Sequence, residues 1–112
     1  MIVRNQSLDT TLGSSITMAD TFGKRLRGLM FRKWLAPGEG LVIAPCNAIH
    51  THFMRFPIDV LFLDEHWRVV QVIPAMRPWR QSPVVRGAKM VLELTSGGAG
   101  ATVAGDQLQV EG

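Results

Sequence analysis

The sequence predicts a small, mainly β protein at the margin of the α+β class. We expect a compact sandwich or barrel of short strands with one main helix near residues 20–31. Apolar residues fall in runs of strand length, separated by turns rich in Gly, Pro and Asp. Apolar residues recur at helical spacing in one stretch, near residues 20–31. A chain of 112 residues has the length of one ordinary domain, so residues 1–112 are expected to form a single domain.

The helix is predicted from apolar residues that follow Asp20, whose side-chain oxygen can cap a first turn. The basic residues of this stretch lie elsewhere on the helical wheel. Gly23 and Gly28 each weaken the helix, by up to about 1 kcal/mol relative to alanine. Its end is therefore expected near residues 28–31. The apolar residues at helical spacing are Phe22, Leu26, Leu29 and Met30.

The strands are predicted from short runs of β-branched and large apolar residues. Residues 58–63 and 68–73 are expected to form a β-hairpin across a short turn at residues 64–66. Residues 74–83 hold three prolines without periodicity, which predicts a long loop. The other predicted strands cover residues 2–5, 15–18, 41–44, 49–54, 90–94 and 107–110.

Composition excludes several classes of protein. A hydrophobic fraction of 46% and a charged fraction of 19% are typical of a globular chain. No run approaches the roughly 20 apolar residues of a membrane span. The first residues lack the pattern of a secretory signal, so a cytoplasmic location is expected. Cys46 is the one cysteine, which excludes an internal disulfide and a four-cysteine zinc site. No cofactor is indicated.

A cluster of basic residues lies between positions 24 and 33. Basic patches can meet nucleic acid, so a nucleic-acid accessory protein that uses this helix is one alternative. No recognised nucleic-acid-binding motif accompanies the charge, and a solvated helix face explains it without a partner. The cluster consists of Lys24, Arg25, Arg27, Arg32 and Lys33.

The segment from Cys46 to Asp59 holds most of the residue types that carry chemistry. If residues 49–54 form a strand, His50, His52 and Met54 share one face, which Cys46 can approach from the preceding loop. Thiolate, imidazole and thioether suit copper or zinc, so a metal protein or an enzyme using Cys46, His50 and His52 is a second alternative. In the simpler interpretation, the histidines are solvated and Met54 belongs to the core.

Two polar residues flank Pro57 in this segment. Arg55 and Asp59 can form a charge pair across the proline turn, or Arg55 can hold a carboxylate or phosphate of a ligand. Cys46, His50 and Asp59 also have the types of a nucleophile, a base and an orienting group. Such a trio is recognised by geometry rather than by order in the chain.

The chain resembles domain-of-unknown-function family 192 in several motifs that appear in family order. The most specific of them is the string from Met54 to Asp59, Met-Arg-Phe-Pro-Ile-Asp. The resemblance implies a compact, β-rich fold with one main helix, and it implies no activity, cofactor or catalytic residue. Many relatives look exported, and many carry another residue in place of His52. The other motifs are Arg25-x-x-Gly28-Leu29-Met30-x-Arg32, Gly38-Glu39-Gly40-Leu41, Arg68-Val69-Val70, Leu92-Glu93-Leu94-x-x-Gly97 and Gly105-Asp106.

The leading hypothesis is a non-catalytic module that binds a small ligand or assists another protein. A mixture of polar and apolar side chains around one turn is typical of a binding pocket. The sequence indicates neither a partner nor an oligomeric state. The candidate binding patch consists of His50, Thr51, Met54, Arg55 and Asp59.

Overall fold

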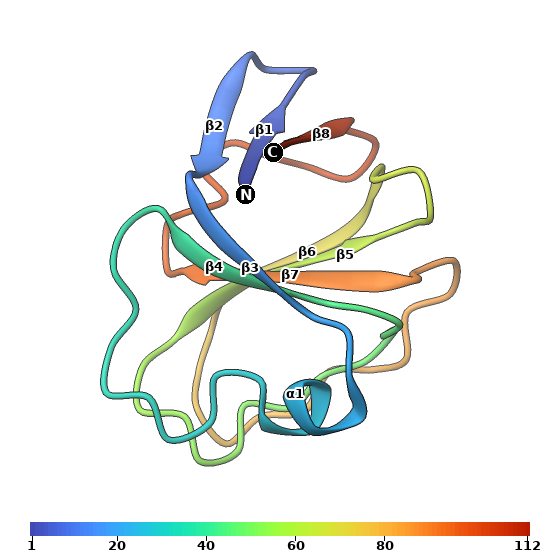
Figure 1. The fold of residues 1–112 in the computed structure, drawn as a ribbon. Coiled ribbons are helices and arrows are strands. Elements are labelled where there is room, and N and C mark those ends of the chain that lie inside the picture. The colour runs from blue at the N-terminus through green and yellow to red at the C-terminus, as the bar shows by residue number, and fades with distance from the viewer.

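The computed structural model describes residues 1–112, apart from the side chain of Phe22. Its strands form a five-stranded sheet, ordered β3-β4-β7-β5-β6, and a three-stranded sheet, ordered β2-β1-β8. The mainly β prediction is confirmed, and the sheets form layers rather than a closed barrel (Figure 1). The elements are β1 (Ile2–Asn5), β2 (Thr10–Gly13), β3 (Ser15–Ala19), α1 (Phe22–Arg27), β4 (Glu39–Ile43), β5 (Ile58–Leu63), β6 (Val69–Met76), β7 (Met90–Thr95) and β8 (Leu108–Glu111).

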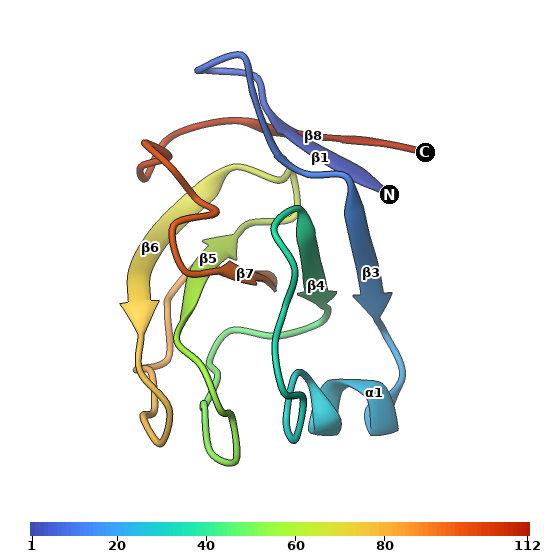
Figure 2. The ribbon, with the colours of Figure 1, turned by 90° about the vertical axis from the view of Figure 1, so that its left-hand side faces the viewer.

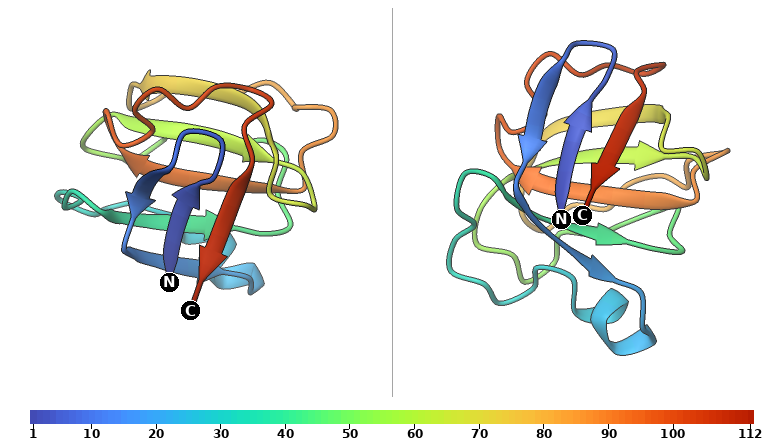
Figure 3. Two further views of the ribbon diagram at one scale, coloured as in Figure 1. Left: turned by 90° about the horizontal axis from the view of Figure 1, so that it is seen from above. Right: turned by 45° about the horizontal axis from the view of Figure 1, so that its top comes forward.

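The five-stranded sheet lies at the centre of the molecule and buries both of its faces. The three-stranded sheet covers one face, with its strands crossing those below (Figure 3). The helix α1 and the long loops lie toward the other face (Figure 1). Successive residues of a strand point to opposite faces, so Val60 and Phe62 enter the core on the helix side while Leu61 and Leu63 enter the core under the small sheet. This two-sided burial explains why five of the six residues of β5 are apolar, with Asp59 as the exception.

The topology brings the two ends of the chain together. β1 pairs with both β2 and β8, and Ile2 lies opposite Glu111 (Figure 3). β3 and β4 are parallel, and the connection that includes α1 joins them. The predicted hairpin is confirmed, because β5 and β6 pair in antiparallel fashion.

The helix is shorter than the stretch 20–31 that the spacing predicted. Thr21, not Asp20, caps it, since the Thr21 hydroxyl accepts a hydrogen bond from the Lys24 amide at 3.3 Å. Gly28 ends it with a φ of 52°, in the left-handed region that favours glycine. Leu29 is buried as expected, but Leu26 is exposed. Phe22 was also predicted to belong to the apolar face of the helix, but its side chain is not among those that the structure describes.

The predicted basic helix is likewise incomplete. Arg32 and Lys33 lie beyond α1, in the loop that leads to β4. Arg32 donates to the carboxylate of Glu39 at 2.7 Å, and this hydrogen bond lowers the pKa of Glu39. The five basic residues therefore do not form one helical face.

Other differences concern the ends and the number of the strands. The strand at residues 10–13 was not predicted, because its polar residues lie on a small sheet with one solvent face. β6 continues through Pro74 into the stretch predicted as a loop, which an edge strand tolerates. Residues 49–54 do not form a strand. They follow an irregular path with one isolated bridge between His50 and Gln81, and Phe53 has a φ of 64°.

No helix among the described residues is both long and apolar enough to cross a lipid bilayer.

Candidate functional site

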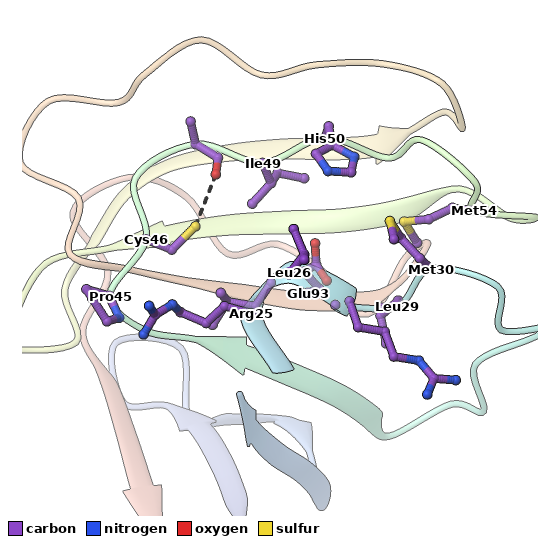
Figure 4. A pocket seen from close by; sticks show the side chains of 14 residues that line it. Arg25, Leu26, Leu29, Met30, Pro45, Cys46, Ile49, His50, Met54 and Glu93 are labelled. Carbon is purple, nitrogen blue, oxygen red and sulfur yellow. Dashed lines mark hydrogen bonds between the residues drawn. The ribbon is translucent and has the colours of Figure 1, made fainter. Parts of the chain in front are cut away.

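A cavity of about 270 Å³ lies between α1 and the helix-side face of the five-stranded sheet. Ile43 of β4 and Glu93 of β7 contribute from the sheet, and the segment that follows β4 closes another side. Figure 4 shows side chains from these three parts of the chain converging on one space. The cavity is therefore built by segments far apart in the sequence.

Glu93 is the most unusual residue of this cavity. Its neighbours Leu92 and Leu94 point into the core under the small sheet, so alternation along β7 directs Glu93 toward the helix side. The side chain is only 2% exposed, and its Oε1 atom has no hydrogen-bond partner among the described residues. An unpaired buried carboxyl group is costly, because burial removes its water without replacing the lost hydrogen bonds.

Burial also changes the protonation of Glu93. Desolvation raises its pKa from 4.5 to about 8. At pH 7 the carboxyl group is therefore mainly neutral, and it can both donate and accept a hydrogen bond. Because Glu93 also lines the cavity, its neutral carboxyl group can form a hydrogen bond with a polar group of a ligand there.

The rest of the wall is mostly apolar. Met30 and Met54 lie together on one side of Glu93, and Cys46 lies on the other (Figure 4). The Cys46 thiol donates to the carbonyl oxygen of Ala48, with 3.1 Å between Sγ and the oxygen. Burial raises the pKa of this thiol, so it stays protonated near neutral pH. Cys46 therefore contributes a small apolar surface rather than a thiolate.

Cations lie at the rim of the cavity. Arg25 and Arg27 contribute from α1, and Arg25 is near enough to Cys46 to favour the charged form of its thiol slightly. Burial outweighs this effect. The cavity thus combines an apolar wall, one neutral acid and a positive rim.

Two of the five residues in the candidate binding patch, His50 and Met54, line this cavity. Met54 is also part of the helix-side core, as the simpler interpretation expected. Thr51 is fully buried beneath the loop after β6. Its hydroxyl donates to the Arg77 carbonyl at 2.6 Å and accepts from the Arg80 amide at 2.9 Å.

The predicted pair of Arg55 with Asp59 is wrong. Arg55 is exposed, whereas Asp59 points to the opposite face of the sheet, into the core region under the small sheet. Its carboxylate accepts from the backbone amides of Ala75, Gly97 and Ala99 at 2.9, 3.0 and 3.0 Å. Three backbone donors satisfy Asp59 without an arginine. The trio of Cys46, His50 and Asp59 is consequently not assembled.

The predicted metal-ligand face is also wrong, because residues 49–54 are not a strand. His50 and His52 stay close, with ring centroids 4.8 Å apart, but the His52 amide donates to Nδ1 of His50 at 3.2 Å. Met54 is buried while His50 is exposed. Among the described residues, no group of three or more His, Cys, Asp and Glu side chains has the arrangement of a metal site.

A second hollow, of about 440 Å³, lies between β6 and the loop that precedes β8. Its one carboxylate is Asp59, which is already fully hydrogen-bonded. This hollow therefore offers a ligand less than the cavity beside Glu93 does.

Sequence reasoning overlooked Glu93 as a site residue. The available signal was a single acidic residue inside the otherwise apolar run of residues 90–94. A strand with both faces buried has no solvent face for a carboxylate, so such a residue must be paired or serve a function.

Comparison with known proteins places the chain in a family. A model of domain-of-unknown-function family 192 (DUF192, Uncharacterized ACR) matches residues 3–110. The chain belongs to this family. A UPF0127 protein of Pyrococcus horikoshii is 41% identical over 86 residues, which cover 71% of this chain and 70% of the relative. The resemblance seen in the sequence motifs is thereby confirmed.

Two crystal structures share the fold of this family member. A protein of unknown function from Novosphingobium aromaticivorans superposes with a TM-score of 0.80 at 24% identity, covering 97% of this chain and 82% of that one. A Sinorhizobium meliloti protein, provisionally assigned as a transcription regulator, gives a TM-score of 0.79 at 21% identity, with 96% and 89% covered. At these identities the likeness shows the fold alone. The family itself is one of unknown function.

Proposed function

We propose that this chain is a non-catalytic binding module for a small, mostly apolar and uncharged molecule with one hydrogen-bonding group. The observation that carries the proposal is the unpaired Oε1 atom of the buried Glu93 carboxyl. A hydroxyl or amide group of the ligand would supply the missing hydrogen bond. Such a bond to a buried group contributes both affinity and orientation.

The surroundings of Glu93 favour a neutral ligand over a cation. A pKa of about 8 leaves little negative charge on Glu93 at pH 7. The positive charges of Arg25 and Arg27, two residues that line the cavity, oppose the entry of an ammonium group. The volume of about 270 Å³ is slightly below that of typical drug-sized sites, so the ligand should be small.

General acid catalysis by Glu93 is a second candidate. A carboxyl group whose pKa lies near neutral pH can give or take a proton during a reaction. Glu93→Gln separates the two functions, because glutamine keeps the hydrogen bonds but cannot transfer a proton. A ligand that binds the variant and is not converted by the wild type supports the binding module.

Methionine-methyl NMR offers a direct test, since Met30 and Met54 line the cavity and the other four methionines do not. The probes are benzyl alcohol, toluene and benzylamine. We expect benzyl alcohol to shift the Met30 and Met54 signals in a saturable manner, with weaker effects of toluene and benzylamine. The remaining methionine signals serve as internal controls.

Variants of Glu93 complete the test. Glu93→Gln should keep the preference for benzyl alcohol over toluene, and Glu93→Leu should abolish it. Glu65→Gln, which changes an exposed carboxylate, is the matched control. Equal shifts from benzyl alcohol and toluene in the wild type would contradict a polar role for Glu93, and an absence of shifts from all three probes would reject the cavity as a site for molecules of this size.

A further inference from the structure

Exposed aromatic rings gather at the end of the molecule opposite the small sheet. Phe31, Phe53 and Trp79 are 56%, 49% and 56% exposed, although each is large and apolar. They come from three separate loops, which lie side by side at one end in Figure 2. The ring centroids of Phe31 and Phe53 are 5.4 Å apart, and those of Phe53 and Trp79 are 4.7 Å apart. We call these three residues the aromatic patch.

The backbone holds these rings outward at an energetic cost. Phe31, Phe53 and Trp79 have φ values of 68°, 64° and 62°, in the left-handed region that bulky residues avoid. Strain of this kind costs about 1–3 kcal/mol per residue and persists where neighbouring contacts enforce it. Here the Phe31 amide donates to the Phe53 carbonyl at 3.1 Å, and the Trp79 amide donates to the Thr51 carbonyl at 3.0 Å. Three strained residues at three loop tips point to a role for the exposed rings.

The three loop segments that carry the aromatic patch contain charged residues of one sign only. Segments 29–34, 50–57 and 77–82 hold five of the twelve Lys and Arg residues and none of the nine Asp and Glu residues. The rest of the chain holds seven basic and nine acidic residues, so the molecule is polarised. Arg32 is paired with Glu39, and no ion pair among the described side chains involves Arg55, Arg77 or Arg80.

From this combination we infer that the loop end docks on the surface of an anionic lipid bilayer. Trp and Phe side chains favour the interface between water and hydrocarbon, and nearby Lys and Arg side chains are attracted by negatively charged headgroups. The patch is small, so binding depends on both contributions. Docking is independent of the ligand proposed for the Glu93 cavity.

Single-stranded nucleic acid also combines aromatic and basic contacts, but the ring geometry favours lipid. Nucleobases stack on open ring faces. In this patch neighbouring rings lie against one another at interplanar angles of 37° and 60°, and His52 stacks on Trp79 with centroids 5.6 Å apart. The rings therefore present a joint apolar surface rather than separate platforms for bases.

The test is sedimentation of the full chain with vesicles of phosphatidylcholine, either alone or mixed with phosphatidylglycerol. We expect binding to the mixed vesicles only, and weaker binding at higher salt. Trp79→Ala and Phe53→Ala should each lower the partition coefficient by about tenfold. Trp79→Phe should retain most of the binding, and Arg55→Gln should lower it about fivefold.

Val103→Ala is the matched control, because Val103 is 58% exposed in the loop between β7 and β8. It should bind vesicles as the wild type does, and circular dichroism of each variant verifies that the fold is kept. Absence of binding to the anionic vesicles overturns the inference. So does equal binding of Trp79→Ala and the wild type, or binding to an oligothymidylate in place of vesicles.

Discussion

Two buried carboxyl groups on neighbouring strands show how surroundings decide the role of a residue. Asp59 on β5 and Glu93 on β7 point to opposite faces of the same sheet. Asp59 receives three backbone hydrogen bonds and ties β5 to β6 and to the loop after β7. Oε1 of Glu93 receives none. The first carboxylate stabilises the fold, whereas the second costs stability and is available to a ligand.

The stability of the protein should report the protonation of Glu93. The folded state holds the proton more tightly than the unfolded state does, since the pKa is about 8 when folded and 4.5 when exposed. Stability from this group is thus fully present below pH 4.5 and is lost as the pH rises toward 8, by roughly 1.4 kcal/mol per pH unit. Glu93→Gln should remove this slope. The measurement is urea unfolding of both proteins between pH 5 and pH 9, and parallel curves would contradict the assignment.

The hydrogen bonds of Asp59 can be tested in the same way. Asparagine has one acceptor oxygen, so Asp59→Asn leaves at least one of the amides of Ala75, Gly97 and Ala99 without a partner. We expect a loss of about 1–3 kcal/mol in the free energy of unfolding and faster hydrogen exchange at those amides. Asp20→Asn, at an exposed position, is the control and should change neither. Unchanged exchange at all three amides would show that the carboxylate does not hold them.

At the scale of elements, the sequence predicts a strand well where packing against the rest of the protein determines which residues are apolar. Five of the six residues at positions 58–63 are apolar because both faces of β5 are covered, and this pattern is visible in the sequence. The path of residues 49–54 depends instead on Thr51, which bonds a loop about thirty residues away. No local sequence pattern predicts such a long-range hydrogen bond. The sequence therefore predicts the site only in part, since it indicates Cys46, His50 and Met54 but not Glu93.

Substitution by alanine should change the stability of the protein in opposite directions at Gly40 and at Gly23. In Gly40→Ala the new Cβ would lie 2.7 Å from the Glu93 carbonyl oxygen and 2.8 Å from Leu94 Cδ2, so β4 and β7 must separate. We expect a loss of about 1–3 kcal/mol. A Cβ at Gly23 in α1 meets nothing within 4 Å, and Gly23→Ala should stabilise the protein by up to about 1 kcal/mol. Thermal unfolding measures both, and a stabilising Gly40→Ala would contradict the close approach of the two strands.

At the scale of the whole molecule, one sheet serves two cores. The five-stranded sheet packs on the small sheet through one face and on the helix side through the other. The small sheet in turn joins both ends of the chain. The cavity and the aromatic patch both lie on the helix side. Long loops replace regular strands at that end of the molecule (Figure 2). The small sheet thus holds the two ends of the chain together, and both candidate sites lie at the opposite end of the molecule.

Because the two cores share a sheet, residues 1–112 should unfold as a single cooperative unit. Ile58→Val trims the helix-side core, and Ile16→Val makes the same change in the core under the small sheet. Each should lower the free energy of unfolding by about 0.5–1.5 kcal/mol. Each should also accelerate the slowest amide exchange equally in β1 and β5, as native-state hydrogen exchange would measure. If Ile58→Val accelerated exchange in β5 and left β1 unchanged, the two cores would be separate units, and the chain would not be a single domain.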